Sequence, residues 1–414
     1  MANVVDGIRT PVMQRPAGAA ITDTDDETTY AEFWKSCDRF AGAIRDREYT
    51  QGDRIAVWLP DGRDLLVTAV GTLRNGGTIV LLPAHYDGET VVDVLEGTGT
   101  TALVTTADRV ASNLSRLTSS SLRLLVTTDG EATVGLGFEK LLDNDGLYSS
   151  GSRTGIEVIK RGPDAVAMLA YPATVDGDPF SVTYTHGAIT RTMLGVGKLL
   201  ESTGSPRTQL GVLPLSHPTG FVLDALATLL AGGEYEVTRR WDVERVQSRL
   251  EERSIDRLYL TSGMDTELLA DGGSIEPTET TVGIVHTVHD GRPKSLENGD
   301  EWDVFRLFSS PMTGVTHVRG PDEDRTLGQP LPGVDTRVVD TVTETDAFEP
   351  VAAGERGTLA VSGPTVPTPV DDTQLANEWT YRADGKRWLR TGLEVRVEDG
   401  RHYLTDTESP PTSP

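Results

Sequence analysis

Cysteine and lysine are scarce in this chain of 414 residues, and long apolar runs are missing. The single cysteine, Cys37, has no partner for a disulfide within the chain, which excludes a disulfide-stabilised scaffold. The longest apolar runs, such as residues 79–83, are far shorter than the roughly 20 residues of a membrane-spanning helix. The first residues show no positively charged stretch followed by an apolar one, as a secretory signal does. We therefore expect a protein without a membrane span in a reducing cytoplasm.

Acidic residues outnumber basic ones by 63 to 38, which gives a net charge of −25. This charge argues against a nucleic-acid partner, because binding to the phosphate backbone needs clustered lysine and arginine. Only 6 of the basic residues are lysine, and the acidic residues are spread along the whole chain. Such a pattern is typical of a halophilic cytoplasm, where concentrated salt screens the self-repulsion. An ordinary acidic protein is the alternative.

Short β-branched apolar runs alternate with segments of helical periodicity from Thr29 to about Ser310. This alternation predicts an α/β fold with two βαβ-type subdomains and largely parallel sheets, over residues 1–160 and 161–325. The strands expected in this part are residues 54–59, 78–82, 102–105, 122–127, 165–170, 210–213, 257–260, 282–285 and 304–308.

The pattern of apolar and polar residues changes towards the carboxyl end of the chain. Over residues 326–407, alternating strands joined by the turn dipeptides Asp384-Gly385 and Asp399-Gly400 predict a smaller β-rich subdomain, a distorted barrel. Residues 408–414 are rich in proline, serine and threonine, which predicts a flexible tail.

No Gly-x-Ser-x-Gly, His-Glu-x-x-His or Gly-x-x-x-x-Gly-Lys-Ser/Thr motif occurs, so any indication of function has to come from a longer pattern. The segments that form such a pattern are Thr29-Tyr-Ala-Glu-Phe33, Gly52-Asp-Arg-Ile-Ala-Val57 with Leu59-Pro60, Gly76-Gly-Thr-Ile-Val80 with Pro83, Leu213-Pro-Leu-Ser-His217 with Gly220, Gly328-Gln-Pro-Leu-Pro-Gly333, Glu349–Gly357 with Gly363-Pro364, and Trp388-Leu-Arg-Thr-Gly392. In order and approximate spacing they resemble landmarks of the adenylate-forming superfamily of acyl-CoA synthetases, amino-acid-adenylating domains and luciferases. The resemblance covers about residues 26–407.

Members of this superfamily use MgATP to convert a carboxylate into an acyl-adenylate and pyrophosphate, and usually pass the acyl group to a thiol. The resemblance therefore implies ATP or AMP and Mg²⁺ as cofactors, and an acyl or acyl-CoA small molecule as partner, while CoA stays undetermined. It reaches only the large amino-terminal domain of the family. We expect the small carboxy-terminal domain, which carries the family's catalytic lysine, to be absent.

The family's phosphate loop reads roughly Tyr-Thr-Ser-Gly-Thr-Thr-Gly-x-Pro-Lys-Gly, and its equivalent here is Tyr171–Ser181. Thr174, Asp176 and Gly177 are the positional equivalents of nucleotide-binding residues, but Phe180 stands at the lysine position. Asp176 and the aspartate two residues later would face the triphosphate, a repulsion on the order of 1–4 kcal/mol per close charge pair. Bound Mg²⁺ would invert that sign, which makes Asp176 the candidate metal ligand.

Three further nucleotide-binding positions follow from the resemblance. Phe308 keeps the family's aromatic residue near adenine, but Met312 stands where a glutamate binds Mg²⁺, and this ion demands oxygen ligands. Gly291 and Arg292 occupy the place of the adenine shelf, where the bulky arginine would alter the pocket. A surface turn is the alternative for these two residues.

The ribose position is altered as well. Thr391 begins the family's Thr-Gly-Asp triplet, but Leu393 replaces its aspartate, and Glu394 substitutes for it only if the strand register slips. His217 lies at a position that often gates the acyl pocket in this family. Glu394 and His217 are the candidate catalytic residues, and a purely structural histidine is the alternative for His217.

Removing one preorganised charge-stabilising group commonly costs ~10²–10³ in rate, so the loss of several predicts little adenylation. We therefore expect an acyl-CoA synthetase-like pseudoenzyme, acting as a ligand-binding, regulatory or subunit-like homologue. One alternative is an active AMP-forming carboxylate ligase with a divergent site, whose carboxy-terminal domain is supplied by another chain. Another is a structural partner in a homo- or hetero-oligomer with a synthetase.

Overall fold

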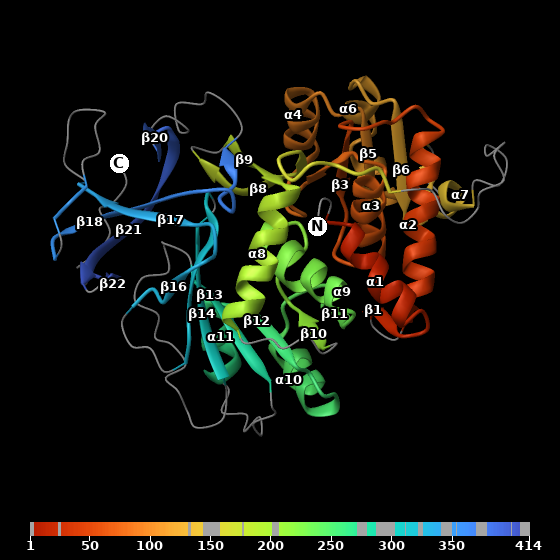
Figure 1. Ribbon diagram of the computed structural model, residues 1–414. Helices are drawn as coiled ribbons and strands as arrows, with labels where there is room; N and C mark the ends of the chain where they lie inside the picture. Colours follow the sequence, from red (N-terminus) through yellow and green to blue (C-terminus); the bar gives the residue numbers. More distant parts are fainter. Residues whose placement is uncertain are drawn as a thin grey trace. The chain divides into compact units, whose positions relative to one another are not determined.

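The computed structural model describes residues 4–23, 26–130, 134–143, 158–175, 178–200, 207–270, 280–286, 303–310, 312–321, 326–340, 350–352, 354–369, 379–398 and 400–405. The chain divides into two compact units. Unit 1 consists of residues 1–190 and 204–242, and unit 2 of residues 191–203 and 243–414. Figure 1 shows the helices and strands of both units along the chain.

A largely parallel sheet carries the first part of unit 1, with its strands in the order β9-β8-β4-β3-β5-β6-β7. The central strands are β-branched apolar runs buried on both faces, as parallel strands between helices are. The strands expected at 54–59, 78–82, 102–105, 122–127 and 165–170 are all confirmed. The strands are β3 (Arg54–Trp58), β4 (Thr78–Leu81), β5 (Ala102–Thr106), β6 (Leu124–Thr128), β7 (Leu136–Gly137), β8 (Val166–Val175) and β9 (Asp178–Thr185).

Two long helices, α2 (Tyr30–Arg45) and α3 (Arg63–Arg74), lie side by side in this unit (Figure 1). α2 begins with a capping box: Thr29 Oγ1 accepts the Glu32 N–H at 3.3 Å, and Glu32 Oε2 accepts the Thr29 N–H at 2.9 Å. Gly71 lets the two helices approach, because a Cβ at this position would lie 2.8 Å from the ring of Phe40. The other helices of this part are α1 (Asp6–Gln14), α4 (Gly88–Thr98), α5 (Ala107–Ser112), α6 (Leu114–Ser119) and α7 (Phe138–Leu142).

A second group of strands in unit 1 joins distant parts of the chain, in the order β10-β11-β1-β2. β1 (Ala19–Asp23) pairs in parallel with β11 (Glu234–Val237), which also pairs in parallel with β10 (Thr208–Gly211). β2 (Asp26–Thr29) runs antiparallel to β1. The helices near these strands in sequence are α8 (His186–Leu199), the π-helix η1 (Gly220–Leu226) and α9 (Ala227–Ala231).

Unit 2 begins with α10 (Val243–Glu252) and three parallel strands, β12 (Arg257–Thr261), β13 (Thr281–His286) and β14 (Asp303–Ser310). α11 (Ser262–Ala270) follows β12. Two antiparallel strands, β15 (Gly314–Arg319) and β16 (Gln329–Pro330), continue the sheet beyond β14. The strands expected at 257–260, 282–285 and 304–308 are confirmed.

The rest of unit 2 is an antiparallel sheet, in the order β17-β18-β21-β20, with β22 also paired to β21. Both expected hairpins are confirmed: Ala383 pairs with Lys386, and Glu398 with Arg401. A small core of Val339, Ala360, Tyr381 and Trp388 lies within this sheet. Its strands are β17 (Asp335–Val339), β18 (Arg356–Ser362), β20 (Thr380–Ala383), β21 (Lys386–Glu398) and β22 (Arg401–Leu404), and β19 (Thr368–Pro369) follows β18.

These sheets confirm the predicted fold class, largely parallel α/β followed by an antiparallel β-rich part. Among the residues that the structure describes, no helix has the length and apolar character to cross a membrane.

Candidate functional site

The segment expected to form the phosphate loop is part of a β-hairpin in unit 1. β8 and β9 pair from Val166 opposite Thr185 as far as Val175 opposite Asp178, with register shifts between Val166 and Met168 and between Ala170 and Ala173. The ladder includes the backbone of Thr174, which lies opposite Pro179. A glycine-rich phosphate loop instead turns successive N–H groups into one concavity, where they can surround an anion. Asp176 and Gly177, two further residues of the predicted site, lie outside the described residues.

Two aromatic side chains of this hairpin are buried. Phe180, at the lysine position, is buried and lies opposite Ala173 in the ladder. Tyr171 is also buried and meets Tyr86 edge to face, with the ring centroids 6.3 Å apart. Burial raises the pKa of Tyr171 to about 12, so its hydroxyl stays neutral at physiological pH. Neither Phe180 nor Tyr171 offers a positive charge to a phosphate.

His217 lies in a tight segment between β10 and η1. Its backbone N–H donates to the Pro214 carbonyl at 3.0 Å, and its Nδ1 accepts the Thr219 N–H at 3.2 Å. Gly220 is required here, because a Cβ would lie 2.3 Å from the Pro214 carbonyl oxygen. Burial lowers the pKa of His217 to about 4, which keeps the imidazole neutral at pH 7. Its predicted catalytic role stays a prediction.

Asp61 contacts this segment from another part of the chain, and the sequence patterns missed it. It follows β3, and its Oδ1 accepts the Leu215 N–H at 3.0 Å, two residues before His217. Burial raises the pKa of Asp61 to about 7, which the hydrogen bond from Leu215 only partly opposes. A carboxyl group that titrates near neutral pH is a common feature of functional sites. The available signal was its place just after the carboxyl end of a parallel strand, where ligands bind in open α/β sheets.

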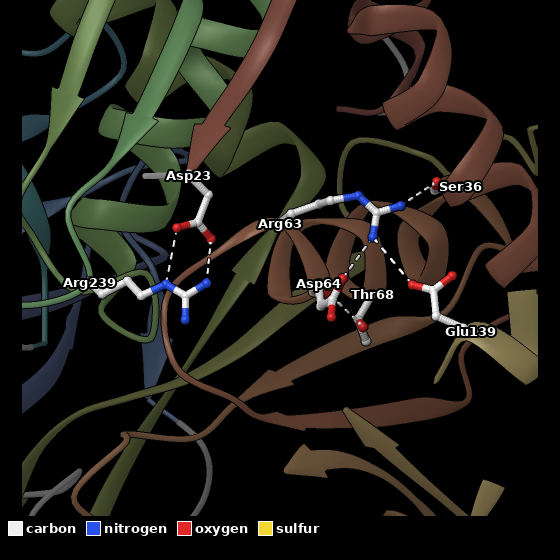
Figure 2. A network of polar contacts seen from close by, with 7 residues as sticks. All are labelled: Asp23, Ser36, Arg63, Asp64, Thr68, Glu139 and Arg239. Atoms are coloured by element: carbon white, nitrogen blue, oxygen red, sulfur yellow. Dashed lines mark hydrogen bonds and ion pairs between the residues drawn. The ribbon is translucent and has the colours of Figure 1, made fainter. Parts of the chain in front are cut away.

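Figure 2 shows two groups of polar contacts in unit 1, one around Arg63 at the start of α3 and one between Asp23 and Arg239. Arg63 contacts Asp64 at 2.9 Å and Glu139 at 3.7 Å, and it donates to Ser36 Oγ at 2.9 Å. In the same view Asp23 forms a bidentate pair with Arg239, with Nε to Oδ1 at 3.0 Å and Nη2 to Oδ2 at 2.9 Å. Arg63 and Arg239 therefore both have carboxylate partners.

The π-helix η1 places a second buried carboxyl group in this part of unit 1. Asp224 Oδ1 accepts a hydrogen bond from Gln209 Nε2 at 3.1 Å. Tyr235 is buried nearby, and burial together with the charges of Asp224 and Asp61 raises the pKa of its phenol. Single-turn π-helices are frequent at functional sites.

The predicted adenine and Mg²⁺ positions are in unit 2. Phe308 is buried at the end of β14, and Arg319 lies over its ring, 5.8 Å from the centroid. Ser310 and Thr313 close the turn to β15 with a 2.8 Å contact between their hydroxyl oxygens. Met312 lies in this turn and has no oxygen for a metal. Gly291 and Arg292 lie outside the described residues.

The ribose position lies at an irregularity of β21. Thr391 is buried, and its Oγ1 donates to the Leu359 carbonyl at 2.9 Å and accepts the Leu393 N–H at 3.1 Å. The pairing of β21 with β18 shifts nearby, so that Arg390 faces Ala360 whereas Glu394 faces Thr358. Glu394 is exposed. Its substitution for the missing ribose aspartate stays a prediction.

The residues at these positions fit MgATP poorly. Phe180, Met312 and Leu393 offer neither charge nor a hard oxygen where the family's motifs have a lysine, a glutamate and an aspartate. Within the described ranges, no group of three or more His, Cys, Asp or Glu side chains could hold a metal ion. We therefore derive no catalytic step through bound MgATP.

The parallel α/β sheets followed by an antiparallel sheet define the architecture of the adenylate-forming enzymes. A family model described as AMP-binding enzyme matches residues 8–368, and the chain belongs to this family. In the family this architecture binds ATP or AMP.

Proteins similar to this chain include CoA ligases and synthases. A 3-[(3aS,4S,7aS)-7a-methyl-1,5-dioxo-octahydro-1H-inden-4-yl]propanoyl:CoA ligase of Rhodococcus jostii is 24% identical over 414 residues, which cover 94% of this chain and 76% of the relative. A feruloyl-CoA synthase of Amycolatopsis is 24% identical over 398 residues, 94% of this chain and 75% of the relative. The chain thus spans about three quarters of the length of each.

Two solved structures share the fold. A long-chain-fatty-acid-CoA ligase from Archaeoglobus fulgidus has a TM-score of 0.83 at 17% identity, over 98% of this chain and 84% of that one. ATP-bound MatB from Rhodopseudomonas palustris has a TM-score of 0.79 at 19% identity, over 98% of this chain and 78% of that one. At these identities the likeness is one of fold.

Proposed function

We propose that this protein is an acyl-CoA synthetase-like homologue that binds an acyl or acyl-CoA ligand and does not by itself form an acyl-adenylate. The observation that carries the proposal is the β-hairpin at residues 166–185, with buried Phe180 at the lysine position. Adenylation needs donors that surround the phosphates and stabilise the charge that develops during transfer. Among the described residues of this segment, the paired backbone of residues 173–175 and the aromatic side chain of Phe180 supply neither.

The acyl-binding part of the proposal rests on unit 1. The segment from Pro214 to His217 keeps the family's pattern and is held by Asp61 through the Leu215 N–H. Burial keeps the ring of His217 neutral, so an acyl chain would meet no fixed positive charge there. Two relatives of this chain, a propanoyl:CoA ligase and a feruloyl-CoA synthase, support a ligand of this class.

Acid-dependent exchange of labelled pyrophosphate into ATP tests the proposal. The purified chain is incubated with MgATP and acetate, hexanoate, benzoate or palmitate, and a heat-inactivated sample is the control. We expect no exchange above the control with any of the four acids. Exchange that depends on one of them would show an active ligase with a divergent site, and would overturn the proposal.

A variant that restores the family's residue types tests whether these positions determine nucleotide binding. Phe180→Lys, Met312→Glu and Leu393→Asp together return the family's residue types to three positions, and calorimetry compares their affinity for AMP with that of the wild type. We expect the wild type to bind AMP at least tenfold more weakly than the triple variant, since a charge-assisted hydrogen bond contributes about 1.5–3 kcal/mol. Equal affinities would mean that these positions do not determine nucleotide binding.

A further inference from the structure

Unit 2 contains a cavity of about 390 Å³ at one end of the antiparallel sheet, where β17, β18 and β21 meet. The volume lies in the range of small-molecule sites, roughly 300–1,000 Å³. None of the residues predicted to bind nucleotide lines it. Its lining consists of Asp335, Ser362, Gly363, Pro364, Val366, Pro367, Thr368, Lys386, Arg387 and Leu389.

Specific contacts hold the wall formed by residues 362–368 in place. Gly363 has a φ of 124°, and a Cβ there would lie 2.1 Å from the Gly333 carbonyl oxygen, so only glycine fits. Thr365 Oγ1 donates to the Pro332 carbonyl at 3.0 Å, and Ser362 Oγ donates to the Arg387 carbonyl at 2.6 Å. The cavity is therefore a preformed feature of the sheet end.

Two adjacent cations of β21 line this cavity and differ in their partners. Lys386 Nζ lies 2.6 Å from Asp335 Oδ2, an exposed ion pair. Arg387 is partly buried, and its Nη2 donates to the neutral Thr368 Oγ1 at 2.5 Å. Across the described part of the chain, no carboxylate pairs with Arg387. Its guanidinium keeps further donors for an oxyanion.

A second arginine faces the first across the hairpin. Arg382 of β20 is directly opposite Arg387 of β21, so their side chains lie on the same face of the sheet. Like charges in this arrangement are destabilising. Burial and the positive charge of Arg382 both lower the pKa of Arg387. Acidic residues outnumber basic ones by 63 to 38 in this chain, yet within the described ranges no carboxylate pairs with Arg382 either.

We infer that this cavity binds a small organic anion, an oxyanion on a compact apolar body, with Arg387 as its principal contact. Arginine donates two parallel hydrogen bonds to a carboxylate or a phosphate, and the anion would relieve the repulsion between the two arginines. Pro364, Val366 and Leu389 offer apolar walls to the body of the ligand. The inference is independent of the proposed function, because it uses no residue of the nucleotide or acyl positions.

Isothermal titration calorimetry of the full chain at low ionic strength, with hexanoate and hexyl phosphate as probes, tests this site. We expect saturable binding of at least one probe, and binding at least tenfold weaker in Arg387→Gln, since a charge-assisted hydrogen bond contributes about 1.5–3 kcal/mol. The matched control is Arg401→Gln, an exposed arginine of β22 that does not line the cavity, and its affinity should equal that of the wild type. The two probes distinguish a carboxylate ligand from a phosphate ester.

Two more variants test the anion site if Arg387→Gln fails to fold. Arg387→Lys keeps the charge but loses the paired donors, and we expect it to bind at least threefold more weakly than the wild type. Arg382→Gln should raise the melting temperature of the ligand-free protein by relieving the repulsion. The inference is wrong if neither probe saturates, if Arg387→Gln and Arg387→Lys both bind as the wild type does, or if inorganic phosphate binds as tightly as either probe.

Discussion

Replacing Asp61 with asparagine tests whether this carboxyl group destabilises unit 1 as the pH rises. Burial raises the pKa of Asp61 to about 7, whereas an aspartate in an unfolded chain has a pKa of about 3.9. Between these two values the folded protein keeps a proton that the unfolded chain has released. Folding stability therefore falls as the pH rises through this window, and the loss is nearly complete above pH 7.

The magnitude follows from the difference between the two pKa values. About three units at 1.36 kcal/mol each correspond to about 4 kcal/mol. Asparagine keeps a carbonyl oxygen that can accept the Leu215 N–H, and it has no charge to remove from water. We expect Asp61→Asn to match the wild type within about 1 kcal/mol at pH 4, and to be more stable by up to about 4 kcal/mol at pH 8.

Urea unfolding followed by tryptophan fluorescence at pH 4, 6 and 8 measures this difference. Glu96→Gln is the matched control, because it removes an exposed carboxylate of α4. It should shift the stability by no more than about 0.5 kcal/mol at any of the three values. A gain for Asp61→Asn that is the same at pH 4 and pH 8, or a loss at pH 8, would refute the reasoning.

Two further substitutions test the packing of unit 1 by urea unfolding. Arg74→Met removes the cation that lies 2.5 Å from the buried Asp38 carboxylate, and we expect a loss of about 3–5 kcal/mol. The control is Arg116→Met, which breaks the exposed ion pair of Arg116 and Glu89 and should lower the free energy of unfolding by less than about 1 kcal/mol. Equal losses of stability in the two variants would contradict the argument. Gly211→Ala would bring a Cβ within 2.2 Å of the Tyr235 hydroxyl, and we expect it to lower the free energy of unfolding by about 1–3 kcal/mol. The control is Gly97→Ala, whose Cβ meets no atom within 4 Å and should cost no stability. A Gly211→Ala variant as stable as the wild type would show that Tyr235 moves freely.

Local sequence patterns were sufficient to predict most strands of the parallel sheets. A run such as Arg54–Trp58 alternates with helical segments, and burial on both faces of a parallel strand selects apolar residues at nearly every position. The hairpin at Asp384-Gly385 was equally predictable, because Asp384 has a φ of 52° and Gly385 a φ of 71°, a backbone that favours this pair of residues.

The candidate site was only partly visible in the sequence. The motif positions near Phe180 and His217 could be named from their spacing, but the extension of β8 to Val175 could not. The strand expected at 165–170 continues because β9 pairs again with Ala173, Thr174 and Val175, beyond an irregularity that follows Ala170. Asp61 gave no motif, since its significance comes from the Leu215 N–H, 154 residues away in the chain.

The order of apolar and polar residues along the chain was enough to predict the α/β class and the antiparallel end, and the resemblance to the adenylate-forming family predicts altered residue types at the phosphate and metal positions. These are local properties, set by side-chain periodicity and by residue identity. Only the tertiary structure decided that β1 pairs with β11, that Asp61 holds the segment of His217, and that Arg382 faces Arg387 beside a cavity. Pairing partners, burial and the resulting pKa depend on residues brought together from distant parts of the chain or by strand register, which the order of residue types alone does not specify.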